Sequence, residues 1–388
     1  MRRLLVTTPR GSGGALTHLR RVLPLIMRAR PAWRVELHAP AELLRAAFGR
    51  DDAPWMVTMG GAGYGGRLRW EMVDMPAEVE RVPGTLLYSP FGPMLNVAAA
   101  RRAVWASRNI IPLLPPDTWE IEDADRLRTL ALRGLVAFSA RVAPRTICVS
   151  EHARASLMAL TGLSGETIRV IPHGADVVEP DRRCADAAAE AIRRVPYVLN
   201  VGQPTPYRRT RELIAGYARL AARRSDLPVL VLVGNARPVD RAYGEECSAL
   251  VEPLVRAGKA VHLGQLPHGD VLALTASAHV VAYPSVHEDC PNVILEALAG
   301  GRVIVCADVP ATRELAEGAA VFVRDPHPAG IERALDDAIH DDALRRDLGR
   351  RARERAALFT WERCAESTVG VLEEAFRAPG PGRRGRRR

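Results

Sequence analysis

The sequence contains almost no lysine and no paired cysteines. Its 388 residues include a single lysine, Lys259, although lysine and arginine together number 54. No Gly-x-x-x-x-Gly-Lys-Ser/Thr segment and no Gly-x-Ser-x-Gly segment occurs, so a P-loop nucleotidase and an α/β-hydrolase both lose support. The six cysteines are scattered without a Cys-x-x-Cys pair. This spacing argues against a zinc site or a disulfide framework and fits a reduced cytoplasm.

Long apolar runs are also missing, and the positive charge is unevenly placed. No stretch approaches the roughly 20 apolar residues of a membrane span, and the first residues have too short an apolar run for a signal peptide. The net charge is +9. Five arginines contribute to it from the Gly/Pro-rich tail that begins at Pro379. We expect this tail to be disordered, either solvated or attracted to an anionic membrane surface. No aromatic residue interleaves its arginines, so nucleic acid is not expected as a partner.

Short β-branched segments alternate with helical patterns along the whole chain. A chain of 388 residues exceeds what one hydrophobic core usually supports, so we expect two domains. The alternation predicts parallel sheets with crossover helices, and each half has enough βα units for its own Rossmann-like sheet. The predicted strands of the first half are Leu4–Thr8, Val35–Ala39, Thr85–Ser89, Val104–Ser107, Thr146–Ser150 and Ile168–Ile171. Those of the second half are Tyr197–Val201, Val229–Val233, Ala260–Leu263, Val280–Tyr283, Val303–Cys306 and Ala320–Val323. Residues 172–196 are polar and are interpreted as a linker.

The most informative segment, residues 283–301, carries two carboxylates eight residues apart. A predicted strand leads into a polar loop that contains Glu288, and a helix is predicted to begin near Asn292, with Glu296 in its first or second turn. A helix N-terminus offers unpaired N–H groups and a positive dipole end, which suit a phosphate. The carboxylates suit hydroxyl groups on either side of that phosphate. A nucleotide-sugar, a diphosphate with a sugar at each end, meets all of these groups at once.

A second set of groups suited to an anion follows the predicted strand Tyr197–Val201. Gly202 and two prolines fix a turn, and Arg208 or Arg209 then lies at the start of a predicted helix over Arg211–Arg224. A cation at a helix N-terminus is unfavourable against the dipole, and a bound anion relieves that conflict. A pair of solvated arginines is the alternative interpretation.

Two glycine-rich segments lie in the first half. Residues 9–19 follow the first predicted strand, and their glycines let a ligand approach the backbone closely. Their spacing differs from Gly-x-Gly-x-x-Gly, so we expect no dinucleotide site, and a tight turn between strand and helix is the alternative interpretation. Residues 60–66 follow no clear strand. They are interpreted as a flexible loop that can fold over an acceptor substrate.

With these residues the chain resembles the retaining glycosyltransferases of the group 1 type (family 4), whose fold is GT-B. The resemblance extends from the first glycine-rich segment to Trp361 and is strongest over residues 146–325. The paired-glutamate segment, in its strand–loop–helix setting, is the most specific match. The matching segments are Val149-Ser150, Ile171–Asp176, Val201-Gly202 through Tyr207-Arg208, Leu232–Gly234, Glu288-x7-Glu296, Arg313–Leu315 with Gly318–Ala320, and Phe359–Glu362.

The resemblance implies an α/β fold in which two Rossmann-like domains face each other across a cleft. The first domain, residues 1–178, is then the acceptor side, and the second, residues 179–361, binds the nucleotide-sugar. A C-terminal helix over residues 362–378 crosses back to the first domain, and residues 379–388 form the disordered basic tail.

The resemblance also implies roles for individual residues. Glu288 holds hydroxyls of the donor sugar, Glu296 binds the nucleotide ribose, and Arg208 neutralises the diphosphate. An arginine in place of the usual lysine is tolerable, since its guanidinium grips phosphate bidentately. The other donor-binding residues are Gly13, Gly14, Gly202, Gln203, Cys290, Pro291, Asn292 and Val293.

Several positions depart from the family pattern. Gln203 stands where many members carry a second diphosphate-binding arginine, and residues 289–291 replace the commoner Gly-Phe-Gly. Asn109 aligns roughly with a catalytic-site histidine of other members, and we count it with Glu288 and Arg208 as catalytic. The residues assigned to the acceptor or interdomain side are Asn109, His173 and Gly174.

The implied activity is transfer of a sugar from a nucleotide-sugar to a glycan, lipid-linked or small-molecule acceptor with retention of configuration. We expect no cofactor and no metal, because no Asp-x-Asp pair occurs in a plausible donor loop. A sugar-nucleotide epimerase, a phosphorylase on the same fold and a non-catalytic nucleotide-sugar-binding scaffold remain as alternatives. A phosphorylase requires a cofactor lysine, and Lys259 lies just before a predicted strand. We expect a cytoplasmic protein, with peripheral contact to the inner face of the membrane as a further possibility.

Overall fold

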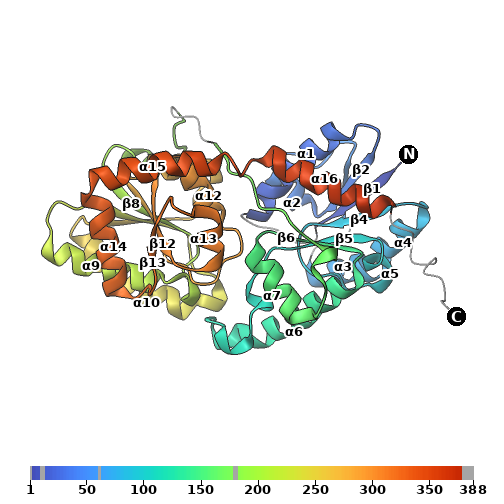
Figure 1. Cartoon of the computed structure of the whole chain (residues 1–388), viewed down its shortest axis with the longest axis horizontal. Coiled ribbons are helices and arrows are strands. Elements are labelled where there is room, and N and C mark those ends of the chain that lie inside the picture. Colours follow the sequence, from blue (N-terminus) through green and yellow to red (C-terminus); the bar gives the residue numbers. More distant parts are fainter. Residues whose placement is uncertain (1, 9–13, 60–62, 178–181, 378–388) are drawn as a thin grey trace. The chain divides into compact units, whose positions relative to one another are not determined.

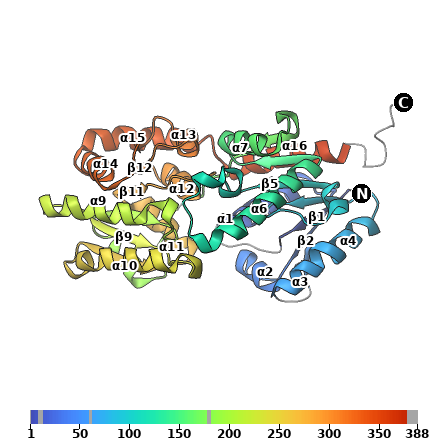
Figure 2. The same cartoon turned by 90° about the horizontal axis from the view of Figure 1, so that it is seen from below.

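The computed structural model describes residues 2–8, 14–59, 63–177 and 182–377, which form two compact units (Figure 1). Of these residues, unit 1 contains those up to 116, residues 129–173 and those from 361 onward. Unit 2 contains residues 117–128 and 174–360. Each unit is a parallel sheet with helices on both faces, as Figures 1 and 2 show.

In the described part of unit 1 the sheet has seven strands in the order β3-β2-β1-β4-β5-β6-β7. All neighbouring pairs are parallel. The strands are β1 (Arg3–Thr7), β2 (Arg34–Ala39), β3 (Met56–Thr58), β4 (Leu86–Ser89), β5 (Ala103–Ser107), β6 (Arg145–Cys148) and β7 (Ile168–Val170). The six strands predicted from the first half of the sequence are confirmed. The seventh, β3, was missed because it is a three-residue edge strand with two exposed residues.

The helices of unit 1 cover both faces of this sheet. They are α1 (Gly14–Ala29), α2 (Ala41–Phe48), α3 (Gly63–Arg69), α4 (Met75–Arg81), α5 (Val97–Ala100), α6 (Asp123–Val142), α7 (Glu151–Thr161) and α16 (Trp361–Arg377). The first residues of α6, up to 128, belong to unit 2.

The prediction of a flexible loop over residues 60–66 is wrong for residues 63–66, which begin helix α3; residues 60–62 lie outside the described part of the chain. Helix α3 continues through a π-helical turn, residues 70–74, into α4. The indole N–H of buried Trp70 donates to Thr7 Oγ1 at 3.0 Å. Packing of this continuous helical segment therefore overrides the low helix propensity of its glycines.

The sheet of unit 2 has, among the described residues, six parallel strands in the order β10-β9-β8-β11-β12-β13. They are β8 (Tyr197–Val201), β9 (Val229–Val233), β10 (Ala260–Gly264), β11 (Val280–Tyr283), β12 (Val303–Ala307) and β13 (Val321–Val323). All six were predicted from the sequence. The helices are α8 (Ala187–Ile192), α9 (Thr210–Arg223), α10 (Arg241–Arg256), α11 (His268–Ser277), α12 (Asn292–Ala299), α13 (Pro310–Ala316), α14 (Pro328–His340) and α15 (Asp342–Ala356).

The interpretation of residues 172–196 as a linker is wrong for its second half. Helix α8 lies within it and is capped by the Asp186 side chain, which accepts from the Ala189 N–H. The buried carboxylate of Asp270 accepts from the backbone N–H groups of Ala185 and Asp186 at 3.0 and 2.9 Å. The polar residues Asp186 and Asp270 thus bind the backbone of residues 185–189. Helix α8 and the residues just before it form part of unit 2.

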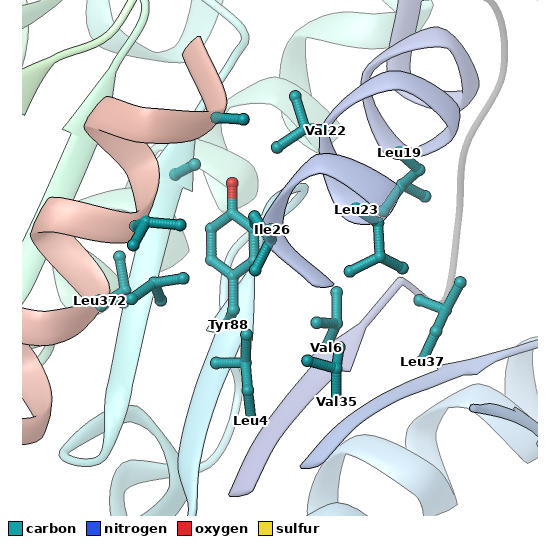
Figure 3. Close-up of a cluster of buried hydrophobic side chains, with 14 of the residues drawn as sticks. Leu4, Val6, Leu19, Val22, Leu23, Ile26, Val35, Leu37, Tyr88 and Leu372 are labelled. Carbon is teal, nitrogen blue, oxygen red and sulfur yellow. The ribbon is translucent and has the colours of Figure 1, made fainter. Parts of the chain in front are cut away.

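The C-terminal helix α16 packs on unit 1, as predicted. Figure 3 shows Leu372 of α16 and Ile26 of α1 on either side of Tyr88, which rises from strand β4. An ion pair at 2.7 Å joins Arg30, the residue after α1, to Glu373 of α16. The last helix of the chain therefore completes the core formed by the first strands.

The strand order places two loops of unit 2 next to each other. Strands β8 and β11 are neighbours, with Val280 paired to Val198, but their crossovers lead to opposite halves of the sheet. This is the topological switch point of the sheet, where the loops after the two strands diverge and leave a crevice. The loops that begin at Gly202 and at Pro284 are therefore brought together at this point.

Candidate functional site

Glu288 is held at the switch point by two hydroxyl groups. The phenol of Tyr283, the last residue of β11, donates to Glu288 Oε1 at 2.6 Å. The Ser285 hydroxyl donates to the same oxygen at 2.7 Å. Burial raises the pKa of the Tyr283 phenol well above its usual value, so this group remains a donor at any physiological pH. The half-buried carboxylate of Glu288 thus has a fixed orientation.

Arg208 lies against the backbone of Gly202, the first residue after β8. A Cβ at Gly202 would be 2.1 Å from Arg208 Nη1, and Gly202 has a φ of +145°, a conformation that favours glycine. No ion pair to Arg208 is found among the described residues, and its buried Nε has no hydrogen-bond partner there. Burial disfavours the charged form, but the nearby Tyr283, Glu288 and Tyr207 side chains more than offset this and raise the pKa of Arg208.

The two loops are tied together by a backbone hydrogen bond. The carbonyl oxygen of Tyr207 accepts from the Val286 N–H at 2.8 Å, and the Ser285 hydroxyl lies 3.4 Å from the same oxygen. The turn that carries Arg208 is therefore fixed to the loop that carries Glu288. A cation and a carboxylate predicted from separate sequence segments occupy one site.

Glu296 lies in the second turn of α12 and is 7% exposed. Burial raises its pKa to about 7; the charge of His268 lowers this pKa and that of Asp176 raises it. His268 Nε2 is 3.2 Å from Asp176 Oδ2, and both of those residues come from outside α12. Glu296 therefore changes charge near neutral pH in this unliganded form.

The remaining donor-side residues predicted in unit 2 belong to the loops after β8 and β11 and to the start of α12. Helix α12 begins at Asn292, as predicted, with Pro291 at its N-cap position and no side chain capping it. Cys290 and Pro291 are buried, Asn292 and Val293 are half-buried, and Gln203 is exposed. Gly14 opens α1 in unit 1, and Gly13 lies outside the described residues.

Two of the three residues predicted for the acceptor or interdomain side, Asn109 and His173, make contacts within unit 1. The exposed Asn109 accepts from the Ile111 N–H through Oδ1 at 3.2 Å, which caps a short turn after β5. His173, the last residue of its stretch of unit 1, stacks on Trp361 at 5.9 Å between ring centroids. Gly174 begins the next stretch of unit 2. Their assignment to the acceptor side stays a prediction.

His173 belongs to a buried cluster that the sequence did not indicate. Arg108 Nη2 is 3.1 Å from Nε2 of His18, and Arg108 Nη1 contacts Nε2 of His173. A guanidinium only donates, so Nε2 of His18 and Nε2 of His173 both act as acceptors. Burial, followed by the charges of Arg108 and His173, lowers the pKa of His18 well below its usual value. The cluster links α1, the end of β5 and the start of α16 within unit 1.

A pocket of about 450 Å³ adjoins Gly202 on the β9 side of unit 2. Helix α10 and the segment after β9 line it, and its polar lining includes Asn200, Asn235, Arg237, Arg241 and His262. This pocket was not predicted. Gly202 and residues 232–234 lie in segments that match the family pattern, but the lining from α10 and His262 carries no motif. In the part of the chain that the structure describes, no group of three or more His, Cys, Asp or Glu side chains is placed to hold a metal ion. The expectation of a metal-free reaction stays a prediction.

Comparison with known proteins extends the resemblance. Residues 183–355 match the model of the glycosyl transferases group 1 family. The matched region contains strands β8–β13, the Gly202–Arg209 turn and both glutamates. The Asp176 carboxylate beside His268 lies outside it.

Curated relatives carry the same type of name. The O-antigen chain mannosyltransferase B of Escherichia coli is 30% identical over 178 residues, covering 46% of this chain and 45% of that protein. The D-inositol 3-phosphate glycosyltransferase of Nocardia farcinica is 30% identical over 264 residues, covering 63% of this chain and 54% of that protein. This chain thus spans about half the length of the curated relatives it matches.

Solved structures establish the fold. Anabaena HepE in complex with UDP-glucose superposes with a TM-score of 0.70 at 18% identity, over 96% of this chain and 100% of that one. WaaG, a glycosyltransferase involved in lipopolysaccharide biosynthesis, gives a TM-score of 0.64 at 15% identity, over 95% and 99%. The shared fold is GT-B, with two Rossmann-like units and a C-terminal helix on the first. Within the described residues no helix has the length and apolar character needed to span a bilayer.

Proposed function

We propose that this protein is a glycosyltransferase that moves a sugar from a nucleotide-sugar to an acceptor hydroxyl. The observation that carries the proposal is the hydrogen bond from the Val286 N–H to the carbonyl oxygen of Tyr207, at 2.8 Å. This bond ties the turn that carries Arg208 to the loop that carries Glu288. A guanidinium and a carboxylate held together suit a diphosphate and the sugar attached to it.

Arg208 and the start of α12 stabilise the leaving group. The bond between the anomeric carbon and the diphosphate oxygen breaks, and negative charge grows on that oxygen. A guanidinium with no ion pair to any of the described residues, together with a helix N-terminus, offers preorganised positive charge at that place. The acceptor oxygen forms the new bond to the anomeric carbon on the face that the diphosphate leaves, which gives retention. The departing diphosphate oxygen takes the proton of the acceptor hydroxyl, and this scheme needs no metal.

Glu288 binds hydroxyls of the donor sugar. Its Oε1 already accepts two hydrogen bonds, from Tyr283 and Ser285, so the orientation of the carboxylate is set before the sugar arrives. Glu296 accepts hydrogen bonds from the ribose hydroxyls in its ionised form. A pKa of about 7 in the unliganded protein means that nucleotide binding favours loss of its proton.

The acceptor is proposed to be a polyhydroxyl compound, either a glycan, a lipid-linked glycan or a small molecule. The names of the relatives, an O-antigen chain mannosyltransferase and D-inositol 3-phosphate glycosyltransferases, support this class. A cytoplasmic protein that touches the inner face of the membrane through its arginine-rich tail fits a lipid-linked acceptor. Residues 378–388, which include that tail, lie outside the described part of the chain.

The position of Lys259 disfavours a phosphorylase. Its Nζ donates to the carbonyl oxygen of Ala221 at 2.8 Å, near the C-terminal end of α9. Arg208 precedes the other end of this helix, about 16 Å away along the axis at 1.5 Å per residue. The one lysine of the chain is therefore remote from the proposed phosphate site.

The proposal is tested by incubating the protein with UDP-, GDP- and dTDP-sugars, with and without candidate acceptors, and measuring released nucleoside diphosphate. A glycosyltransferase releases it faster when an acceptor is present. An epimerase changes the sugar without releasing nucleotide, and a non-catalytic scaffold binds the nucleotide-sugar and leaves it intact. Either of these two results would overturn the proposed function.

A further inference from the structure

Arg209 has a backbone conformation that does not suit an arginine. Its φ of 56° and ψ of 31° are left-handed, and among the described residues it is the sole non-glycine with positive φ. Left-handed backbone costs an L-residue other than Asn or Asp on the order of 1 kcal/mol, and such outliers cluster at functional sites. Glycine would adopt this turn without strain. A guanidinium is therefore retained at a position where the backbone favours no side chain.

The Arg209 side chain is only partly satisfied by its neighbours. Its Nη2 contacts Glu120 Oε1 at 2.7 Å, and its Nη1 is 3.8 Å from Glu212 Oε1. Its Nε is buried and has no hydrogen-bond partner among the described residues. The guanidinium side chain is 28% exposed, so an anion from solvent can reach it.

Glu120 belongs to a segment that contacts both loops of the candidate site. Residues 117–128 are part of unit 2, although they precede its remaining residues by a long stretch of chain. Two residues before Glu120, the carbonyl oxygen of Thr118 accepts from His287 Nε2 at 2.8 Å. Residues 118–120 therefore contact His287, which precedes Glu288, and Arg209, which follows Arg208.

The charges of this turn are incompletely balanced. Arg208 has no ion-pair partner among the described residues, while Arg209 has Glu120. A nucleoside diphosphate brings at least two negative charges, so Arg208 alone neutralises only part of them. A second guanidinium follows directly in the chain and is held by a half-exposed carboxylate, with Glu120 35% exposed. Such an ion pair contributes little stability and is readily exchanged.

We propose that Arg209 is a second phosphate-binding residue and that Glu120 occupies its guanidinium until the anionic ligand replaces it. This inference rests on the proposed function. Binding of the diphosphate to Arg209 then releases the Glu120 carboxylate, while Thr118 keeps its hydrogen bond with His287. The exchange makes the affinity for the nucleotide depend on a residue that never touches it.

Three variants test this inference by calorimetric titration with UDP and UMP. Arg209→Gly removes the guanidinium and relieves the strained backbone, so we expect an unchanged or higher Tm. Its Kd for UDP should rise about tenfold, as for the loss of one charge-assisted hydrogen bond, and its Kd for UMP should rise less. Glu120→Gln removes the competitor and should tighten UDP binding about threefold or more. In the double variant that combines Arg209→Gly with Glu120→Gln, the Glu120 change should not alter the Kd for UDP any further.

Arg219→Gln is the matched control. Arg219 lies on the following helix α9 and pairs with Glu332 at 2.6 Å, away from the turn, so its loss should leave the Kd for UDP within twofold. The inference is overturned if Arg209→Gly binds UDP as tightly as the wild type, if Glu120→Gln weakens binding, or if the control weakens it equally. If the wild-type chain binds none of the nucleotides, the proposed function fails as well. If Arg208→Ala loses UDP and Arg209→Gly does not, only this inference fails.

Discussion

The phenol of Tyr283 donates a 2.6 Å hydrogen bond to Glu288, five residues further along the chain. Tyr283 ends strand β11 and Glu288 lies in the loop beyond it, so the last buried residue of the strand orients the first acid of the site. The Ser285 hydroxyl makes the second bond to the same oxygen. The position of the carboxylate is thus set by the strand and not by the loop alone.

Tyr283→Phe should lower turnover without weakening nucleotide binding. The change removes one hydrogen bond to a charged group, and the loss corresponds to about a tenfold lower kcat if the carboxylate becomes mobile. Kinetics with a nucleotide-sugar, together with calorimetric binding of UDP, separates the two effects. The control is Tyr197→Phe, which removes a buried hydroxyl that donates to the Leu274 carbonyl at 2.6 Å elsewhere in unit 2. An equal loss of kcat in the control would contradict the role of Tyr283.

Arg208→Ala and Glu296→Ala should weaken nucleoside diphosphate binding, whereas Glu288→Ala should chiefly reduce kcat. Arg208 and Glu296 are proposed to contact the nucleotide, and Glu288 the sugar. We expect the first two variants to raise the Kd for UDP at least tenfold, since each loses a hydrogen bond to a charged group. Calorimetry with UDP, which has no sugar beyond the phosphates, provides the measurement. Unchanged affinity in both variants would remove the proposed donor site.

Gly202→Ala should displace Arg208. The added Cβ would be 2.1 Å from Arg208 Nη1, and the φ of +145° is strained for any residue but glycine. We expect at least a tenfold weaker binding of UDP. Gly258→Ala is the control, because Gly258 also has a positive φ, +66°, but nothing lies within 4 Å of its Cβ position. If both variants lose stability equally and neither loses UDP affinity, Gly202 is a turn residue only.

Nucleotide binding should strengthen as pH rises through 7. Burial raises the pKa of Glu296 to about 7, and the ionised form is the acceptor proposed for the ribose hydroxyls. The Kd for UDP should therefore fall between pH 6 and pH 8 in the wild type and change less in Glu296→Gln. Loss of His268, whose charge lowers this pKa, should move the transition to higher pH in His268→Ala. A pH profile identical in all three proteins would refute the assignment.

The same shift predicts how stability depends on pH. The folded-state pKa of Glu296 lies above its unfolded value of 4.5, so its contribution is fully present below about pH 4.5 and is lost as pH rises through about 7. The shift corresponds to a loss on the order of 3 kcal/mol. Urea unfolding of wild type and Glu296→Gln at pH 5 and pH 8 measures it. The variant should lose less stability between the two pH values than the wild type.

Leu372→Ala should destabilise unit 1. Leu372 on α16 is fully buried beside Tyr88 and Ile26 (Figure 3), and removing such a side chain costs about 2–5 kcal/mol. Denaturant unfolding measures the change. Glu366→Ala, an exposed position on the same helix, is the control and should change the stability by less than about 0.5 kcal/mol. Equal effects of the two would show that α16 contributes little to the core.

The sequence indicated secondary structure well wherever a local pattern carried it. All strands except β3 were predicted, because buried strands of a parallel sheet appear as β-branched runs between helical patterns. The start of α12 at Asn292 also followed from its strand–loop–helix pattern. Two predictions failed where packing overrode composition. The glycines at residues 63–66 became helical, and the polar stretch before Pro196 acquired helix α8.

By itself, the sequence determined the alternating architecture, the Glu288–Glu296 spacing and the arginines after Gly202, since these depend on periodicity and on neighbours in the chain. Only the tertiary structure decided which side chains meet. Glu120 reaches Arg209 across 89 residues and His268 reaches Asp176 across 92, and no spacing rule links such distant positions. Both contacts depend on the order of strands in a sheet, which brings loops together at the switch point through space and not through sequence.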